Sequence, residues 1–194
     1  MLTGTTRLPR AAWIAAGLGI WLAAALPAAA QIFQPTPPAT TVPAGGTATV
    51  RTSHLTVQAA ASAARLAPGG RVSLSIDITP RPGMHAYAPG KHDYQVVTFT
   101  IDRRPWLATA PLKYPASELY HFVPLDERVE TYLKPFTLVQ DVTVPATAEA
   151  RKELAGQASV TVRGTLEYQA CDDKICYAPA KVPLEFRLDV AAAQ

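Results

Sequence analysis

Apolar and polar residues alternate along five segments of the chain, and this alternation is the main structural signal in the sequence. A period of two predicts strands that bury one face and expose the other. In the third segment a polar residue, Gln140, occupies one of the apolar positions. The apolar positions of the five segments are Val72, Leu74, Ile76 and Ile78; Val97, Phe99 and Ile101; Phe136, Leu138, Val142 and Val144; Val160, Val162, Leu166 and Tyr168; and Val182, Leu184, Phe186, Leu188 and Val190.

The segments between these strands contain almost no helical pattern. Only ATAEARKELAG, residues 146–156, has the composition of a helix, and turns rich in Pro and Gly, such as TPRPG, separate the strands. This organisation predicts an all-β fold, an antiparallel β-sandwich. The same pattern is compatible with an eight-stranded barrel. Gly164 interrupts the fourth segment and indicates a bulge or a close contact with a neighbouring strand.

The first 30 residues have the pattern of a secretory signal peptide. Arg7 and Arg10 precede an apolar run from Ala11 to Leu26, and three small residues then form an Ala-x-Ala cleavage pattern. We therefore expect cleavage after Ala30 and an exported protein without stable membrane insertion. A single membrane anchor is the alternative, although a spanning helix usually needs about 20 apolar residues.

The remaining chain divides into a leader and one domain. Residues 31–52 are rich in Pro, Thr, Ala and Gly and show the period of neither helix nor strand, which is typical of a flexible linker. We expect a signal peptide (1–30), this linker (31–52), a folded domain (53–190) and a tail (191–194). Loss of Arg7 and Arg10 with the signal peptide would lower the net charge from +3 to +1. Without a basic stripe, nucleic acid is not an expected partner.

The chain has only two cysteines, Cys171 and Cys176, in the segment EYQACDDKICYAPAK. Export would bring them into an oxidising compartment, where an even number of cysteines favours an intramolecular disulfide. Four residues separate them, which is a common hairpin-loop length. Opposed residues in an antiparallel pair have Cα atoms about 4.5 to 5.5 Å apart, within the disulfide range. The spacing therefore permits a bridge.

The alternation also predicts how the cysteines are oriented. Even-numbered residues of the fourth segment are apolar, so Cys171 continues the odd-numbered polar series and is expected near the surface. A hairpin that pairs Cys171 with Cys176 matches odd with even positions, whereas the fifth segment is apolar at even positions. We therefore expect an irregularity in YAPAKVP, which contains Pro179 and Pro183.

From the residues alone, three kinds of site remain open: a structural staple, a metal site and a redox couple. A staple that closes a loop of about six residues would stabilise the fold by roughly 2 kcal/mol. A metal site needs three or four converging ligands, and the best soft-ligand set, His85 and His92 with Met84, has no supporting spacing. A redox couple needs access to one sulfur, and the two acidic residues after Cys171 disfavour a highly reactive thiolate.

The segment GTLEYQACDDKICYAPAKVPLEF resembles the cysteine-bearing end of the periplasmic N-terminal domain of the thiol:disulfide interchange protein DsbD. In that family a Tyr-Gln-x-Cys run is followed by a second Cys, an aromatic residue, a proline and a Val-Pro-Leu strand. PGMHAYAPG is similar to the family's Gly-x-x-x-Tyr segment, and LKYPASELYHF and VETYLKPFTL are similar to its middle part. The resemblance extends from about Ser53 to Val190.

The resemblance implies an immunoglobulin-like sandwich in which Cys171 and Cys176 form a redox couple. By the same resemblance, Cys176 is the cysteine expected to contact partners. Tyr87 matches a tyrosine near the couple, His85 stands where the family has another aromatic residue, and Tyr177 is the aromatic residue after the second cysteine.

The family also covers its cysteines with a loop that carries a phenylalanine flanked by acidic residues. The corresponding stretch here is SELYHFVPLDERVE, residues 117–130. It makes Phe122 the expected cap, with Tyr120 beside it and Asp126 and Glu127 as acidic neighbours. Ordinary packing is the alternative role for Phe122 and Tyr120.

Two features depart from the family pattern. The cysteines enclose four residues instead of five, and the sequence ends at Gln194 without membrane and thioredoxin domains, so a membrane reductant would act in trans. We expect a periplasmic thiol:disulfide oxidoreductase of the protein-disulfide reductase type, without cofactor or metal. Its expected partners are exported thioredoxin-like or isomerase-like proteins, including those of cytochrome c biogenesis. The alternative is a non-enzymatic immunoglobulin-like interaction domain with a static disulfide.

Overall fold

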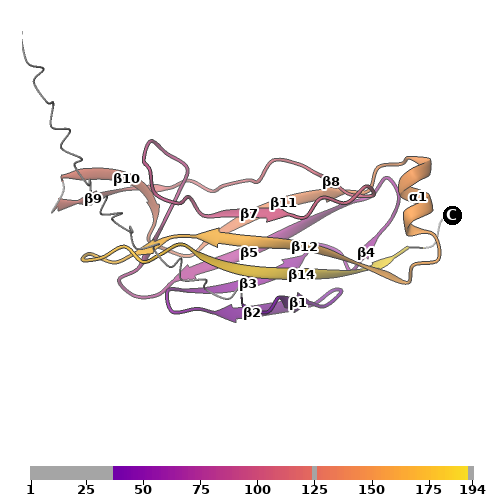
Figure 1. The fold of residues 1–194 in the computed structure, drawn as a ribbon, viewed down its shortest axis with the longest axis horizontal. Coiled ribbons are helices and arrows are strands. Elements are labelled where there is room, and N and C mark those ends of the chain that lie inside the picture. The colour runs from indigo at the N-terminus through magenta and orange to yellow at the C-terminus, as the bar shows by residue number, and fades with distance from the viewer. Residues whose placement is uncertain (1–36, 124–125, 192–194) are drawn as a thin grey trace, which may run out of the picture. The chain divides into compact units, whose positions relative to one another are not determined.

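The computed structural model describes residues 37–123 and 126–191, which form 14 strands and one short helix (Figure 1). The predicted signal peptide lies outside the described residues, as do the start of the predicted linker and most of the predicted tail. None of the described helical residues belongs to a helix long and apolar enough to cross a membrane.

Two five-stranded sheets, A and B, form the layers of a sandwich. In sheet A the order is β1-β14-β12-β7, with β4 also paired to β14, and in sheet B it is β2-β3-β5-β11-β8. The strands of sheet A are β1 (Thr40–Val42), β4 (Arg65–Leu66), β7 (Thr98–Ile101), β12 (Ser159–Tyr168) and β14 (Ala180–Val190). Those of sheet B are β2 (Thr47–Arg51), β3 (Leu55–Ala61), β5 (Arg71–Pro80), β8 (Ala108–Thr109) and β11 (Phe136–Thr143).

The main core contains side chains from both sheets. Ile78 of β5 and Leu138 of β11 belong to the same buried cluster as Leu166 of β12 and Phe186 of β14. The predicted alternation is confirmed, because the even-numbered residues from Val182 to Leu188 are buried in β14 and those from Val72 to Ile78 are buried in β5.

Most strand pairs are antiparallel, and β1 and β4 pair with β14 in parallel. The fold is therefore an all-β, immunoglobulin-like sandwich, as the sequence predicts. The separate sheets of the described chain exclude a single closed barrel.

The predicted helix is confirmed as α1 (Ala148–Leu154). The hydroxyl of Thr147 accepts a hydrogen bond from the backbone N–H of Ala150 at 3.2 Å and caps the first turn. Ala150 and Leu154 are buried on its inner face. A helix this short depends on such packing for its stability.

Gly164 of β12 makes the close contact that the sequence indicates. A Cβ atom at this position would overlap the ring of Phe99 and lie 2.8 Å from the backbone oxygen of Thr100, both in β7.

Gln140, the polar residue in an apolar position of β11, is 5% exposed, and its side-chain amide donates to the backbone oxygen of Ala110. Burial of this amide is therefore matched by a hydrogen bond.

The expectation of an irregular linker over residues 31–52 is wrong for the part from Thr40 to Arg51. This part forms β1 and β2, and Val42 lies in the main core with 1% of its surface exposed. β1 is stabilised by parallel pairing with β14, which no local pattern reveals. In β2 the alternating residues are small, so the period is weak in the sequence.

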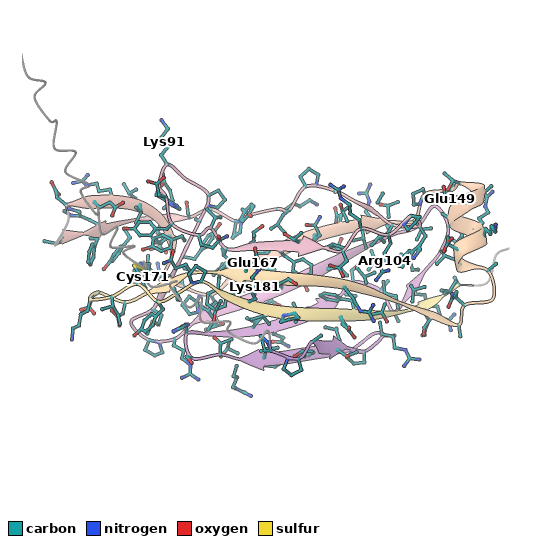
Figure 2. The ribbon with its side chains drawn as sticks, viewed as in Figure 1. Lys91, Arg104, Glu149, Glu167, Cys171 and Lys181 are labelled. Atoms are coloured by element: carbon teal, nitrogen blue, oxygen red, sulfur yellow. A yellow bond between two sulfur atoms is a disulfide. The ribbon has the colours of Figure 1, made fainter. Side chains whose placement is uncertain are left out.

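A third, smaller sheet, C, holds the candidate site. Its order is β13-β6-β10-β9, and its strands are β6 (His85–Tyr87), β9 (Glu118–Phe122), β10 (Glu127–Tyr132) and β13 (Ala170–Cys171). Within the described domain, Cys171 lies near one end and α1, which carries Glu149, lies at the other (Figure 2).

Candidate functional site

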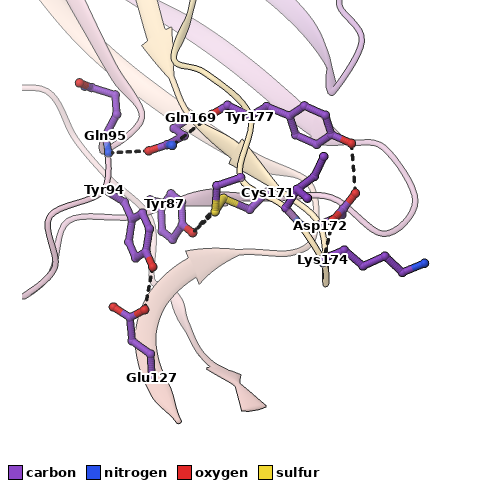
Figure 3. The surroundings of a disulfide bond; sticks show 11 residues. Tyr87, Tyr94, Gln95, Glu127, Gln169, Cys171, Asp172, Lys174 and Tyr177 are labelled. Atoms are coloured by element: carbon purple, nitrogen blue, oxygen red, sulfur yellow. Dashed lines mark hydrogen bonds between the residues drawn. A yellow bond between two sulfur atoms is a disulfide. The ribbon is translucent and has the colours of Figure 1, made fainter. Parts of the chain in front are cut away.

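Cys171 and Cys176 form a disulfide at the end of the β12–β14 hairpin (Figure 3). The two residues face each other in an antiparallel bridge with Cα atoms 4.1 Å apart. The bridge that the spacing permits is thus formed, and the loop inside it consists of residues 172–175.

The predicted irregularity lies immediately before β14. Tyr168 pairs with Ala180, whereas the N–H of Tyr177 bonds to the carbonyl of Ala170 at 2.9 Å. Between these pairs, Gln169 opposes two residues, 178 and 179, so the register shifts by one. This is the arrangement of a β-bulge.

The side chain of Gln169 ties this bulge to the body of the domain. Its Nε2 donates to the carbonyl of Tyr177 at 3.1 Å, and its Oε1 accepts the N–H of Gln95 at 3.1 Å. The strand that leads away from Cys176 is therefore anchored to the loop before β7 (Figure 3).

Cys171 is buried, so the expectation that it lies near the surface is wrong. It does continue the odd-numbered series, but it belongs to β13, which pairs with β6 in sheet C, and side chains of that sheet pack around it. Cys171 is 1% exposed and packs in a second apolar cluster with Tyr87 and Val129, separate from the main core. Cys176, in contrast, is exposed. One sulfur-bearing residue therefore faces solvent and the other faces an aromatic cluster.

A pocket of about 220 Å³ opens next to the disulfide, and both cysteines line it. Most of its walls come from sheet C and the loop after β6. The predicted neighbours that line it are His85, Tyr87, Tyr120, Phe122 and Glu127. The pocket thus brings together most of the site residues that the sequence singles out.

The hydroxyl of Tyr87 lies between the two sulfur atoms. It is 3.0 Å from Sγ of Cys171 and 3.3 Å from Sγ of Cys176. A disulfide sulfur carries no proton, so the hydroxyl is the donor. Burial is the main cause that raises the pKa of Tyr87 well above its ordinary value, and nearby Tyr94 and Glu127 act in the same direction. Tyr87 therefore remains a hydrogen-bond donor at neutral pH.

Tyr94 supports Tyr87 and is a site residue that sequence reasoning missed. The two rings stack with centroids 4.1 Å apart and an interplanar angle of 4°. The hydroxyl of Tyr94 donates to Oε2 of Glu127 at 2.7 Å, and this hydrogen bond is the main reason that the pKa of Tyr94 is raised. The bond joins the loop after β6 to the start of β10 (Figure 3).

His85 is the cross-strand partner of Cys171 in sheet C. Its ring lies 4.7 Å from the ring of Tyr120 and 5.5 Å from that of Tyr87, between centroids. Burial lowers the pKa of His85, and the charge of Asp172 opposes this effect. The imidazole is therefore neutral at neutral pH and acts as one more uncharged wall of the pocket.

The predicted cap is a hairpin formed by β9 and β10, which pair in an antiparallel register from Phe122–Glu127 to Glu118–Thr131. Tyr120 and Phe122 lie on its pocket side. Asp126 is not brought into the pocket: it sits at the hairpin turn, and its carboxylate lies 2.7 Å from Nε2 of His121 at the exposed side.

Tyr177 does not line the pocket either. Its hydroxyl donates to Asp172 at 3.1 Å, and its ring packs on that of His54 with centroids 4.4 Å apart. It therefore supports the loop between the cysteines from outside the pocket.

Besides Tyr94, four pocket residues are not among the predicted site residues: Val129, Asp172, Lys174 and Ile175. Ile175 is 54% exposed beside Cys176. An apolar residue in the otherwise charged loop between the two cysteines is the sequence signal that could have identified it. Within the described ranges, no cluster of three or more His, Cys, Asp or Glu side chains could hold a metal ion.

Fold and site together define a class of protein: an immunoglobulin-like sandwich domain with a disulfide that is buried on one side and exposed on the other. The sequence matches the family described as "Thiol:disulfide interchange protein DsbD, N-terminal" over residues 52–186, which include both cysteines. The chain belongs to this family.

Among solved structures, the N-terminal periplasmic domain of ScsB from Proteus mirabilis is similar, with 14% sequence identity and a TM-score of 0.46. The match covers 71% of this chain and 47% of that chain, so this chain spans about half the length of that structure. A search of curated proteins found no match.

Proposed function

We propose that Cys171 and Cys176 form a redox couple that exchanges electrons with partner proteins by thiol:disulfide exchange. The observation that supports this most is the unequal exposure of the two residues, because Cys176 is exposed whereas Cys171 is 1% exposed. Exchange requires that a thiolate reach one particular sulfur of a disulfide. Attack at Cys176 from solvent would make Cys171 the leaving group.

Reduction of the pair proceeds in two exchange steps. A thiolate of the reductant attacks Sγ of Cys176, a bond forms between these sulfurs, and the electron pair of the broken disulfide leaves on Sγ of Cys171. The second thiolate of the reductant then attacks the reductant's first sulfur, which is joined to Cys176 in the mixed disulfide. This forms the disulfide of the reductant and releases Cys176 as a thiolate. The pair gains two electrons and two protons, and the reductant is left as a disulfide.

Tyr87 would assist the first of these steps. Its hydroxyl, 3.0 Å from Sγ of Cys171, can donate a hydrogen bond to the departing thiolate. Hydrogen bonds to charged groups are stronger than those to neutral ones, so the interaction strengthens as negative charge develops on sulfur. In the opposite direction, the Cys176 thiolate attacks a partner disulfide and Cys171 then displaces the partner.

The partners that we propose are exported proteins with a thioredoxin-like or isomerase-like disulfide, including those of cytochrome c biogenesis. A membrane reductant would supply the electrons. These proposals rest on the family to which the chain belongs and on the signal peptide expected over residues 1–30, and they imply a periplasmic location.

Trapping of mixed disulfides tests the proposed function. Cys171→Ala leaves the exposed Cys176 without a resolving thiol. Its thiolate should form a stable mixed disulfide with a thioredoxin-fold protein that keeps only the first cysteine of its Cys-x-x-Cys motif, activated as a mixed disulfide with thionitrobenzoate, which departs as the thiolate. Cys176→Ala is the matched control: it leaves only the buried Cys171 and should react at least about tenfold more slowly, because buried thiols react poorly. The adduct is measured by intact mass.

Equal rates for the two variants would contradict the assignment of Cys176 as the attacking residue. The absence of an adduct from both variants would instead favour the interaction domain with a static disulfide.

A further inference from the structure

We propose that Asp172 is a positioning residue for the cysteine pair: its carboxylate fixes the loop between the two cysteines and thereby makes the pair a better electron donor. This inference rests on the proposed function, because it concerns the equilibrium between the disulfide and dithiol forms of the pair.

The carboxylate of Asp172 accepts three hydrogen bonds, two from the loop and one from Tyr177, which follows Cys176 (Figure 3). Its Oδ1 accepts the backbone N–H groups of Lys174 and Ile175, each at 2.8 Å. Its Oδ2 accepts the hydroxyl of Tyr177 at 3.1 Å. The N–H of Asp172 also donates to the carbonyl of Ile175 at 3.0 Å. The side chain of Asp172, which lies between the two cysteines in the sequence, therefore fixes the conformation of the loop that the disulfide closes.

These contacts connect the loop to the body of the domain through Tyr177. The ring of Tyr177 packs on His54, and its backbone is bonded to Gln169 and to Ala170. The carboxylate of Asp172 is thus held between the backbone of the loop and a residue that the sandwich fixes in place.

The first consequence concerns the distance between the thiols after reduction. Once the disulfide is broken, the loop and its hydrogen bonds act together with the hairpin strands to keep Cys171 and Cys176 close to each other. A fixed loop raises the effective concentration of each thiol for the other and favours re-formation of the disulfide. A pair that closes readily gives its electrons to a partner more readily.

The second consequence is electrostatic, and it also makes the cysteine pair a better electron donor. The backbone N–H groups of Ile175 and Lys174 are the main causes that lower the pKa of the Asp172 carboxyl, so the group is ionised at neutral pH. A fixed negative charge beside Cys171 disfavours a thiolate. A couple becomes more oxidising when its reduced form is stabilised. Here the charge of Asp172 destabilises the thiolate of the reduced form, so it makes the couple more reducing.

Asp173 provides a matched control for this inference. It carries the same charge one residue further along the loop, but it is exposed, and its side chain makes no hydrogen bond within the described part of the chain. Asp172→Asn removes the charge and keeps an amide oxygen for the two N–H groups. Asp172→Ala removes both the charge and the acceptor.

The test measures the equilibrium of each variant with reduced and oxidised glutathione at pH 7. For the reaction of the dithiol with oxidised glutathione, we expect the equilibrium constant to fall about tenfold in Asp172→Ala, which is about 30 mV for a two-electron couple. We expect about a threefold fall in Asp172→Asn and a change of less than about twofold in Asp173→Asn. The pKa of the Cys176 thiol, measured from the pH dependence of alkylation, should fall in both Asp172 variants.

The inference is overturned if Asp172→Ala stays within about twofold of the unchanged protein, or if Asp173→Asn shifts the equilibrium as much as Asp172→Ala does. If Asp172→Ala does not fold, Asp172→Asn decides, and a shift no larger than that of Asp173→Asn overturns the inference. If glutathione cannot reduce the unchanged protein, the proposed function fails. Equilibration with dithiothreitol then still shows which variants are more easily reduced than others. The two failures are therefore distinguishable.

Discussion

At the scale of residues, the site is defined by what surrounds two chemically identical cysteines. Cys171 is enclosed by Tyr87 and Val129, whereas Cys176 faces solvent beside Ile175. Such unequal surroundings give the two sulfurs different accessibility, and accessibility determines which one a partner attacks. The hydroxyl of Tyr87 lies within hydrogen-bond distance of both sulfurs.

Tyr87→Phe is predicted to slow reduction of the disulfide by dithiothreitol about tenfold, because it removes a hydrogen bond to a thiolate that forms in the rate-determining step. The ring and its stacking on Tyr94 are retained. The rate is followed by stopped-flow alkylation of the released thiols.

Tyr120→Phe is the control for this variant, since Tyr120 lines the same pocket and its hydroxyl makes no hydrogen bond among the described residues. A rate unchanged by Tyr87→Phe, or lowered equally by Tyr120→Phe, would contradict a role for the Tyr87 hydroxyl.

The sequence predicts several of these residues but not their burial. Tyr87, Phe122 and both cysteines follow from the family resemblance, and the structure brings them to one pocket. The exposure of Cys171 was predicted wrongly, because alternation tells which face of a sheet a residue occupies and not which element covers that face. Tyr94 lies in a loop without periodicity, so only its stacking on Tyr87 identifies it.

At the scale of elements, the apolar alternation predicts the strands that build the core, and a register shift places the cysteines. The segments around Ile76, Leu138, Leu166 and Phe186 are strands with the predicted faces buried. β1 was missed because its partner, β14, is distant in sequence, and β2 was missed because its alternating residues are small. Irregular structure at residues 177–179 was predicted from the conflict between odd and even positions, which the β-bulge resolves.

Gly164→Ala is predicted to destabilise the domain by about 1 to 3 kcal/mol. The added methyl group would meet the ring of Phe99 and the backbone oxygen of Thr100, and the backbone oxygen cannot move without disturbing the β12–β7 pairing. The free energy of unfolding is measured by urea denaturation of the oxidised protein.

The glutathione equilibrium of Gly164→Ala serves as its control. Gly164 lies within the sheet A pairing and does not line the pocket, so this equilibrium should stay unchanged in the folded state. An unfolding free energy equal to that of the unchanged protein would show that β7 and β12 can separate at this point without cost.

At the scale of the whole molecule, the disulfide lies outside the main core. Cys171 belongs to the second cluster, whereas the large apolar side chains of both sheets form the first. A bridge across so short a loop contributes only about 2 kcal/mol to stability. We therefore expect the domain to keep its fold when the disulfide is reduced, as the proposed exchange requires.

The reduction potential of the Cys171–Cys176 pair tests the central claim most directly. The purified protein is equilibrated at pH 7 with defined ratios of reduced and oxidised glutathione, free thiols are alkylated, and the fraction of dithiol is read by mass. The account predicts a potential less negative than about −300 mV, where exchange proteins lie. A potential more negative than about −300 mV is that of a structural disulfide and would contradict the account.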